Sequence, residues 1–580
     1  MDAHAKVAPT AGSSSSSSSS SSIKVASETS RLQRLRAHLF ENDISEEMEL
    51  QPYMRERLVK KSELWAFFLL GFGYLAMSNT ATAIFQPLMV QQVARSASHL
   101  KSSPSVPCPT LDTDIPLGDK CVVPLGFMRV EPTSYALLVN VVAVWCTTVV
   151  SLGTSAFADH GRISKKLLMF FCSMLAIATS FMFVGPLIPE LWWVSGLLMV
   201  IALIFSGVTL NFYDAHIPIL ARHHPTVVRA MVKFGEDSIE CNEARVRMAT
   251  FLSGGASAAG FAGGVVLTVM AAIVLMSTNA SSLMIGYCLI MSAVFVLIFL
   301  VAYGLLSYQR TSPALPEGAN RLTFGYVRIY KTIRQVRRLK TMFYYLSAWF
   351  ILGDGLTSAS NIAILLAQSQ LKATNDALIG AAVLQYVSAG VSMWFWIWLQ
   401  NHKGVRPLQV IIANSCLFGL IPVYCLLGLI KSNPVGLKQT WEMYMLASLF
   451  GLFVGAIYSS NRVVFSQFIP LGHENELYAL FEMANVSASW IGPLICAAII
   501  EGAGIRHTWW FLVAQFFIPA VMMVFVDVEK GRLEAVEFYK VEQAEKELEK
   551  MQRQSGSKSE PTGIEIASIV DSEKEQGEDV

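Results

Sequence analysis

Long apolar stretches separated by short polar connections make up most of the chain between its two polar ends. A helix needs about 20 apolar residues to cross roughly 30 Å of hydrocarbon. Stretches of that length begin near Leu64, Tyr135, Leu167, Leu191, Met248, Leu283, Met342, Ala377, Leu408, Met443, Tyr478 and Thr508. The pattern predicts an all-α polytopic membrane protein with twelve transmembrane helices.

The spacing of these stretches divides the chain into two sets of six. We expect an N-terminal tail at residues 1–62, a six-helix bundle at 63–308, a linker at 309–341, a second bundle at 342–527 and a C-terminal tail at 528–580. The first bundle contains a large loop at residues 96–133 and one long connection at 216–247. Two bundles of six helices around a central site are the major facilitator architecture.

Composition agrees with this class and excludes others. Apolar residues make up 53% of the chain and charged residues 15%, against about 25% charged in an average soluble protein. A net charge of +1 gives no support for a nucleic-acid partner. The chain has no Gly-Lys dipeptide for a phosphate-binding loop, no His-Glu-x-x-His and no Cys-x-x-Cys, so we expect no enzyme, metal or cofactor.

Lysines and arginines predict the orientation. The loops on the side of the N-terminal tail contain 19 of them, and the loops on the other side contain eight. Because basic loops stay on the cytosolic side, we expect both termini in the cytosol.

The polar segments allow two interpretations each. A serine run at residues 13–22 indicates a disordered first tail, and residues 529–554, rich in Glu and Lys, are typical of a solvated helix. The second tail would be a plain tether or a docking segment for a protein partner that the sequence does not identify. The basic stretch at 324–340 would be a helix on the membrane surface or an ordinary linker.

Two cysteines, Cys108 and Cys121, lie in the large loop on the far side of the membrane. Such a pair forms a disulfide if that compartment is oxidising.

Asp354 is the clearest charge inside a predicted span, about ten residues from the start of the seventh. A carboxylate at that depth costs at least ~2.5–3.5 kcal/mol, which favours a functional role such as proton coupling. The alternative is an aspartate hydrogen-bonded to a neighbouring helix.

Other polar side chains recur at helical spacing on several spans, which favours a water-filled path, although hydrogen bonds between helices would give the same pattern. These candidate cavity or substrate residues are Tyr74, Asn79, Asn211, Asp214, Ser459, Arg462, Glu482, Asn485 and Ser489.

Several longer strings occur in a characteristic order. They read A-W-F-I-L-G-D-G-L-T at 348–357, R-V-V-F-S at 462–466, S-W-I-G-P-L at 489–494 and D-V-E-K-G-R at 527–532, after P-C at 107–108 and D-K-C-V at 119–122. Together they resemble the autophagy-related protein 22 family of fungi, which are major-facilitator-like carriers of the vacuolar membrane.

The resemblance implies export of amino acids from autophagic degradation across the vacuole membrane, which would maintain the amino-acid supply in nitrogen starvation. It also implies a lumenal loop with Cys108 and Cys121, cytosolic termini and Asp354 as a family position. Two stretches depart from the family: Asn79 stands where a Glu is typical, and 485–489 reads N-V-S-A-S where D-K-G-S-S is typical.

Three functions remain open. The first is a carrier that moves amino acids from the vacuole lumen to the cytosol. The second is a diverged vacuolar carrier of another small metabolite, because amides in place of charged groups suit a neutral solute. The third is a nutrient sensor or scaffold that does not transport.

Overall fold

The computed structural model describes residues 57–101, 107–108, 121–125, 128–158, 163–235, 238–276, 282–310, 339–369, 371, 375–430, 433–488 and 491–555. The tail at 1–56, the linker stretch at 324–338 and Ser489 lie outside this part of the chain.

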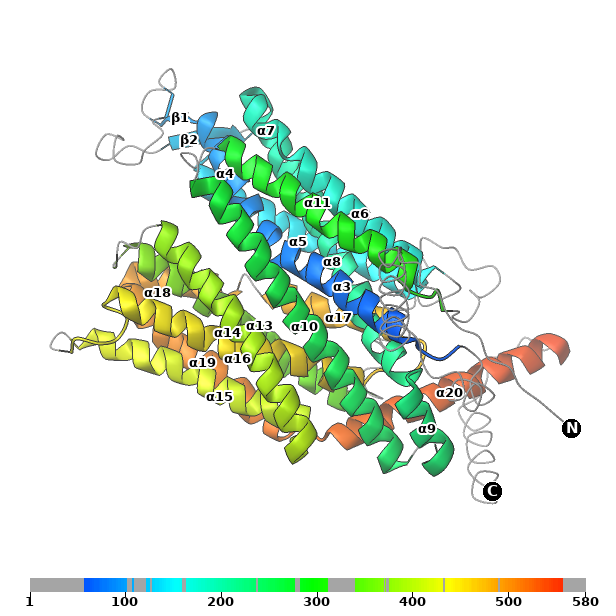
Figure 1. The fold of residues 1–580 in the computed structure, drawn as a ribbon. Coiled ribbons are helices and arrows are strands. Elements are labelled where there is room, and N and C mark those ends of the chain that lie inside the picture. The colour runs from blue at the N-terminus through cyan, green and yellow to red at the C-terminus, as the bar shows by residue number, and fades with distance from the viewer. Residues whose placement is uncertain are drawn as a thin grey trace, which may run out of the picture.

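Helices dominate both halves of the described chain (Figure 1). The first half contains α3 (Lys61–Met77), η2 (Ser78–Phe85), α4 (Gln86–Ser96), α5 (Pro132–Ala158), α6 (Ser164–Phe181), α7 (Val184–Leu187), η4 (Pro189–Leu191), α8 (Trp192–Arg222), α9 (Pro225–Phe234), α10 (Ile239–Met276) and α11 (Ser282–Leu306). The second contains α13 (Lys340–Ser369), α14 (Asn375–Lys403), α15 (Pro407–Leu426), η6 (Leu427–Leu429), α16 (Thr440–Ser466), α17 (Glu474–Ala488), α18 (Ile491–Ala503), η7 (Ile505–His507), α19 (Thr508–Val524) and α20 (Val528–Ser555).

Eleven helical segments of the described residues are long and apolar enough to cross a membrane. The span expected from Tyr478 instead consists of two shorter helices, α17 and α18. Pro493 lies in the first turn of α18, where its missing N–H breaks no helical hydrogen bond. A separate helix therefore starts at Ile491.

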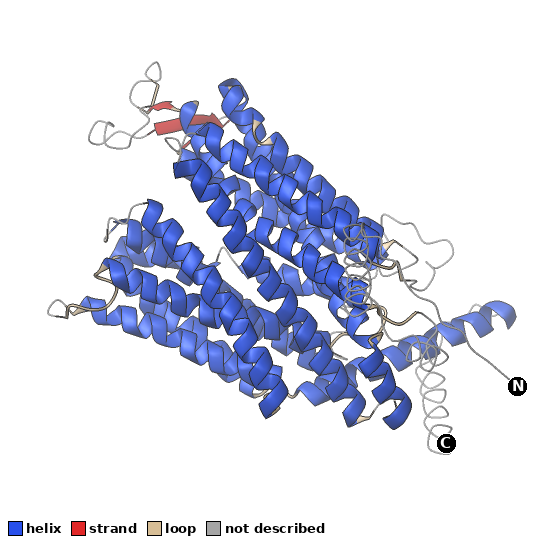
Figure 2. Ribbon diagram, in the orientation of Figure 1, coloured by secondary structure: helices blue, strands red, loops and turns tan. Residues whose placement is uncertain are grey.

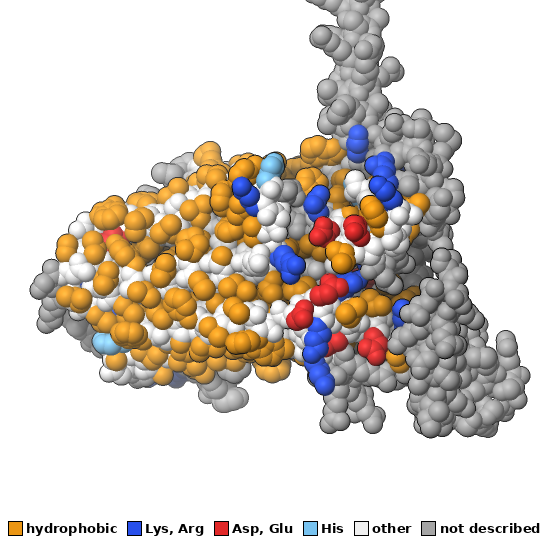
Figure 3. Space-filling view, turned by 90° about the horizontal axis from the view of Figure 1, so that it is seen from below, with side chains coloured by type: hydrophobic (Ala, Val, Ile, Leu, Met, Phe, Trp, Pro, Cys, Tyr) orange, Lys and Arg blue, Asp and Glu red, His pale blue; other side chains and the backbone are white. Residues whose placement is uncertain are grey.

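The outer surface is apolar over the length of the helices. Side chains such as Trp394, Leu305 and Phe525 are among the most exposed large hydrophobic groups. Figure 3 shows one such face, where hydrophobic side chains cover most of the surface and charged side chains gather at one end. Such a belt suits contact with lipid rather than water.

Each half packs around its own core. One cluster of buried apolar side chains is drawn almost entirely from residues 59–303, and a second from residues 339–538. Figure 1 shows the two groups of helices side by side, with α10 and α14 along the boundary. The site between the halves is thus formed by two separately packed bodies.

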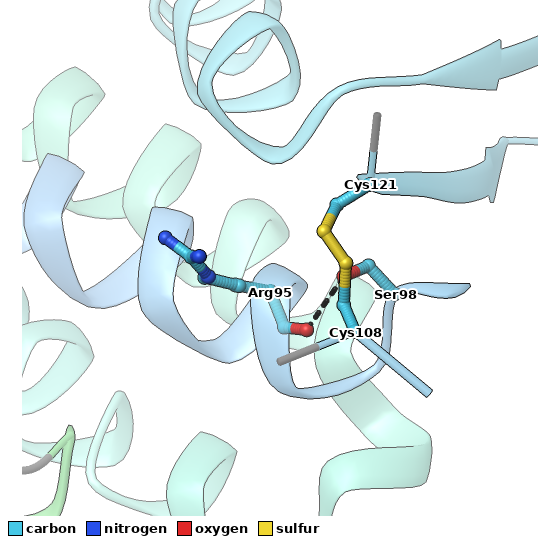
Figure 4. Close-up of a disulfide and its surroundings, with 4 residues drawn as sticks. All are labelled: Arg95, Ser98, Cys108 and Cys121. Atoms are coloured by element: carbon cyan, nitrogen blue, oxygen red, sulfur yellow. Dashed lines mark hydrogen bonds between the residues drawn. A yellow bond between two sulfur atoms is a disulfide. The ribbon is translucent and has the colours of Figure 1, made fainter. Parts of the chain in front are cut away.

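A small antiparallel sheet marks one end of the molecule, here called the sheet end (Figure 2). Strand β1 (His99–Leu100) pairs with β2 (Cys121–Leu125), which pairs with β3 (Met128–Val130). A disulfide joins Cys108 to Cys121 (Figure 4). The backbone N–H of Cys108 donates to the carbonyl of Ser98 at 3.0 Å, so the disulfide lies close to the end of α4.

The opposite end of the molecule is here called the α20 end, and its structure differs from the loop expected there. The connection predicted at residues 216–247 is helical for most of its length, because α8 continues to Arg222, α9 follows and α10 begins at Ile239. His224 caps α9 by accepting a hydrogen bond from the backbone N–H of Thr226 at 3.3 Å, and Pro225 occupies the first helical position.

The C-terminal helix α20 is helical as its composition predicts, but one face of it is buried against the second half. The carboxylate of Glu534 accepts from the backbone N–H of Thr341 at 2.9 Å, at the start of α13. Phe538 is buried, and His473, just before α17, contacts Glu542 through its Nε2 at 2.8 Å. This segment is therefore docked on the helices rather than wholly solvated.

Candidate functional site

The candidate site lies where the two halves meet. Helix α10 packs along α14 and α16, while α17 packs along α5 and α8. Side chains from these helices determine which end of the interface is hollow and which is closed.

A cavity of about 770 Å³ occupies the sheet-end part of the interface. Its walls come from both halves, including η2, α4, α13, α14 and α16. On η2 and α4 the lining residues follow Met77, and on α16 they lie within its first turns, so all of them lie toward the sheet end. The volume is large enough for a small organic solute.

The lining of this cavity is mainly apolar, and none of the described residues that line it is charged. Its polar side chains are neutral: Thr80, Gln91, Gln92, Asn140, Thr268, Ser360 and Gln385. Thr80 belongs to η2, a π-helical stretch inside the first span. Such local widening of a helix often accompanies function, and here it faces the cavity.

Charged residues of the interface lie nearer the α20 end. Arg462 on α16 donates from Nη1 to the carboxylate of Asp214 on α8 at 3.1 Å. Its Nη2 donates to the hydroxyl of Ser257 on α10, also at 3.1 Å. The guanidinium therefore connects the second half of the chain to two helices of the first.

A second carboxylate, that of Glu482 on α17, lies close enough to Asp214 and Arg462 to interact with their charges. It accepts a hydrogen bond from Asn485 at 3.4 Å, one turn along the same helix. Tyr478, on this face too, donates to the carbonyl of Arg462 at 3.1 Å. Tyr478, Glu482 and Asn485 of α17 thus lie beside the ion pair.

Two more contacts close the α20 end. Arg222 at the end of α8 pairs with Glu474 at the start of α17, with an N–O distance of 3.2 Å. Ser253 of α10 donates to the carbonyl of Ser459 on α16 at 2.8 Å. Together with the Asp214–Arg462 pair, these contacts hold the halves together at this end, while the cavity separates them at the other.

Asp354 is buried and fully engaged by neighbouring helices. One carboxylate oxygen accepts from the backbone N–H of Gly492 at 2.9 Å, and the other accepts from the side-chain amide of Gln515 on α19. The first bond satisfies a free N–H in the first turn of α18. These hydrogen bonds are the ones expected if Asp354 has the structural role of joining neighbouring helices. Its role in proton coupling stays a prediction.

The remaining candidates make hydrogen bonds outside the ion pair. Tyr74 donates to the carbonyl of Ser206 at 2.7 Å, within the first half. The amide of Asn211 donates to the hydroxyl of Ser151. The carbonyl of Asn79 accepts from Tyr386 of the other half at 3.1 Å. Of the nine candidates, Asp214, Arg462, Glu482 and Asn485 gather in one cluster, and Ser489 lies outside the described residues.

Sequence reasoning missed the neutral residues of the cavity and the partners of the charged groups. Gln385 and Asn140 are single amides within apolar stretches, and that pattern could have identified them. Gln515 gave the same signal, whereas Ser257 did not, because its importance comes from Arg462 on the helix that lies opposite.

Curated relatives match most of the chain. Autophagy-related protein 22 of Botryotinia fuckeliana is 26% identical, with 84% of each chain covered. Autophagy-related protein 22 of Coccidioides immitis is 27% identical over 83% of this chain and 89% of its own. Autophagy-related protein 22-1 of Penicillium rubens is 27% identical over 85% and 95%.

Solved transporter structures share the fold. The major facilitator superfamily transporter FucP, in an outward conformation, aligns with a TM-score of 0.54 and 12% identity over 80% of this chain and 99% of its own. The proton:xylose symporter XylE, bound to 6-bromo-6-deoxy-D-glucose, aligns with a TM-score of 0.52 and 14% identity over 82% and 97%. The predicted all-α, polytopic major facilitator architecture is confirmed.

The family model described as "Vacuole effluxer Atg22 like" matches residues 59–536. It covers both halves, the cavity, the charged cluster and the first turns of α20. The resemblance inferred from the ordered strings is therefore confirmed, and this membrane transporter belongs to the Atg22 family.

Proposed function

We propose that this protein is a secondary carrier that exports amino acids, released by autophagic degradation, from the vacuole lumen to the cytosol. The observation that carries the proposal is a solute-sized cavity between two membrane-embedded halves, in a chain of the vacuole effluxer family. Transport would supply the cytosol with amino acids during nitrogen starvation.

The distribution of basic residues supports a vacuolar orientation with both termini in the cytosol. The α20 end then faces the cytosol, and the sheet end with its disulfide faces the lumen, an environment outside the reducing cytosol. In this orientation the cavity is on the lumenal side and the contacts at the α20 end close the cytosolic side. The structure would represent the state that receives solute from the lumen.

The chemistry of the cavity favours solutes with an apolar body. Amides and hydroxyls offer neutral hydrogen bonds to an amino group and a carboxylate, and the apolar wall suits a hydrocarbon side chain. Leucine, with a neutral side chain, is therefore our first test substrate.

A diverged vacuolar carrier of another small metabolite is the second candidate. The observation that favours it is the absence of charged groups among the described lining residues, since neither end of a zwitterion would find a counter-charge there.

Amino-acid profiling of vacuoles isolated from nitrogen-starved cells, with and without the gene, tests the first proposal. We expect neutral amino acids to accumulate when the gene is deleted and to return to normal when it is restored. Unchanged amino-acid pools, with a different metabolite accumulating instead, would favour the second candidate.

A further inference from the structure

Three ionisable side chains are buried together between the halves, and their charges do not balance. Asp214 is 1% exposed, Glu482 8% and Arg462 9%. Two carboxylates thus share one guanidinium in the interior of a membrane protein. An ionised carboxylate without a cation is costly there, and binding a proton removes that cost.

The geometry shows which carboxylate lacks the cation. Both terminal nitrogens of Arg462 are engaged, one by Asp214 and the other by Ser257. Among the described residues, Glu482 receives only the amide of Asn485, at the long distance of 3.4 Å. Asp214 therefore has the ion pair, and Glu482 is left with a neutral donor.

The other titratable groups that interact with the charge of Glu482 are phenols, namely Tyr74 on α3, Tyr458 on α16 and Tyr478 on α17 itself. Arg462 is the one cation, among the described residues, whose charge acts on this carboxylate. No second positive group from these elements could balance an ionised Glu482.

The four groups divide between the halves in an informative way. Asp214 and Ser257 belong to α8 and α10 of the first half, whereas Arg462 and Glu482 belong to α16 and α17 of the second. The hydroxyl of Tyr478, one turn before Glu482 on α17, donates to the carbonyl of Arg462 at 3.1 Å and so connects α16 with α17. If the α20 end opens, Arg462 can therefore move away from Asp214 and remain near Glu482. The guanidinium can then exchange one carboxylate for the other.

We propose that Glu482 is the proton-binding residue of this carrier and that Arg462 exchanges partners to release the proton. With the α20 end closed, Glu482 is a carboxylic acid and Arg462 pairs with Asp214. When this end opens, the O–H bond of Glu482 breaks, the proton passes to cytosolic water, and the carboxylate pairs with Arg462. Asp214 is then hydrated by the water that enters. The coupling to solute movement rests on the proposed function.

Asp354 provides the matched comparison. It is also a buried carboxylate inside a span, but two hydrogen-bond donors from α18 and α19 already hold it. Such donors favour the ionised form of a carboxylate. Asp354→Asn therefore separates the two assignments: the proton-binding signal should remain if Glu482 binds the proton, and it should be lost if the predicted proton coupling by Asp354 is correct.

Infrared spectroscopy of the purified full-length protein in lipid tests the assignment without any substrate. The neutral-minus-alkaline difference spectrum should contain the C=O stretch of a protonated carboxyl group that is lost in Glu482→Gln. The same band should remain in Asp354→Asn and in Glu482→Asp, which keeps a carboxyl group. Persistence of the full band in Glu482→Gln, or its loss in Asp354→Asn, would overturn the proposal.

Transport in proteoliposomes tests the coupling, with radiolabelled leucine as the probe. The wild-type protein should accumulate leucine several-fold when a pH gradient is imposed, and Glu482→Gln should not accumulate it beyond equilibrium. Equal gradient-driven accumulation by both proteins would refute the role of Glu482. If the wild type moves no leucine under any gradient, the proposed amino-acid substrate is wrong, while the infrared result still decides whether Glu482 binds the proton.

Discussion

Glu442, in the first turn of α16, shows how one carboxylate can hold a whole turn in place. Its two oxygens accept backbone N–H groups from Gly436, Leu437, Lys438 and Gln439, as well as the hydroxyl of Tyr424. The side chain is fully buried. Sequence inspection did not single it out, because its donors become neighbours only when the turn at 433–439 has formed.

Replacing Glu442 by alanine should therefore lower the free energy of unfolding by about 2–3 kcal/mol, since several buried donors lose their acceptor. The matched control is Glu529→Ala, which removes an exposed carboxylate paired with Arg532 on the surface. That change should cost less than about 1 kcal/mol. Melting temperatures of the purified variants measure both effects, and equal melting temperatures would show that the carboxylate of Glu442 has no structural role.

His224, outside the membrane-spanning segments, predicts a dependence on pH. Burial lowers the pKa of His224 to about 4 from its usual 6.5. The unfolded chain then binds a proton more readily than the folded one, so the cap of α9 contributes fully above about pH 6.5. Its contribution should decrease as the pH falls from there toward 4.

Hydrogen exchange in α9, corrected for the intrinsic effect of pH, measures this loss. The wild type should lose protection between pH 6.5 and 4, while His224→Asn, a capping residue that does not titrate in this range, should keep the same protection throughout. Parallel curves for the two proteins would contradict the titration of His224.

At the scale of elements, the apolar pattern predicted nearly every helix, because length and hydrophobicity alone determine whether a segment can span a bilayer. It did not predict that the span after Tyr478 is two helices, or that residues 225–234 form α9. Both depend on capping contacts, one from Asp354 on a distant helix and one from His224.

Helix α20 was predicted from its composition, but its docked face was not. Phe538 and Ala535 are buried against the second half, while Leu533 is 55% exposed. The pattern of charges on α20 resembles that of a helix surrounded by water. Its buried face is therefore recognisable only when the surface of the second half, against which it packs, is known.

Phe538→Ala should release α20, because a buried aromatic side chain contributes about 3 kcal/mol or more to packing. Hydrogen exchange in residues 528–544 should then accelerate at least tenfold. Leu533→Ala, on the exposed face of the same helix, is the control and should change exchange little. If both variants exchange like the wild type, the docking of α20 does not depend on Phe538.

At the scale of the whole molecule, the architecture could be predicted but the conformation could not. Twelve apolar stretches in two sets indicate the major facilitator arrangement whichever end is open. The state observed depends on a few polar contacts at the α20 end, such as Arg222–Glu474, whose partners are 252 residues apart in sequence. For the same reason, the sequence identified the candidate site only in part. Arg462 and Glu482 were each recognised as single residues, but their clustering depends on contacts between segments that are far apart in sequence.

Glu474→Gln should shift the balance toward a state open at the α20 end, because the pair it removes joins the two halves. A tenfold change in the ratio of open to closed molecules corresponds to about 1.4 kcal/mol. Spin labels at Val232 on α9 and Lys403 on α14, both exposed, report the separation of the halves at this end. We expect a larger population at long distance in the variant, and an unchanged distribution would exclude this pair as a determinant of closure.

The neutral lining of the cavity has a consequence for selectivity. A solute with a net charge would leave water and find no opposite charge among the described lining residues, so its desolvation would be uncompensated. Discrimination of this kind works by rejection rather than by attraction. Lysine and glutamate should be retained in the compartment from which leucine leaves, and the protein would then act as a filter that sorts the products of proteolysis by the charge of their side chains.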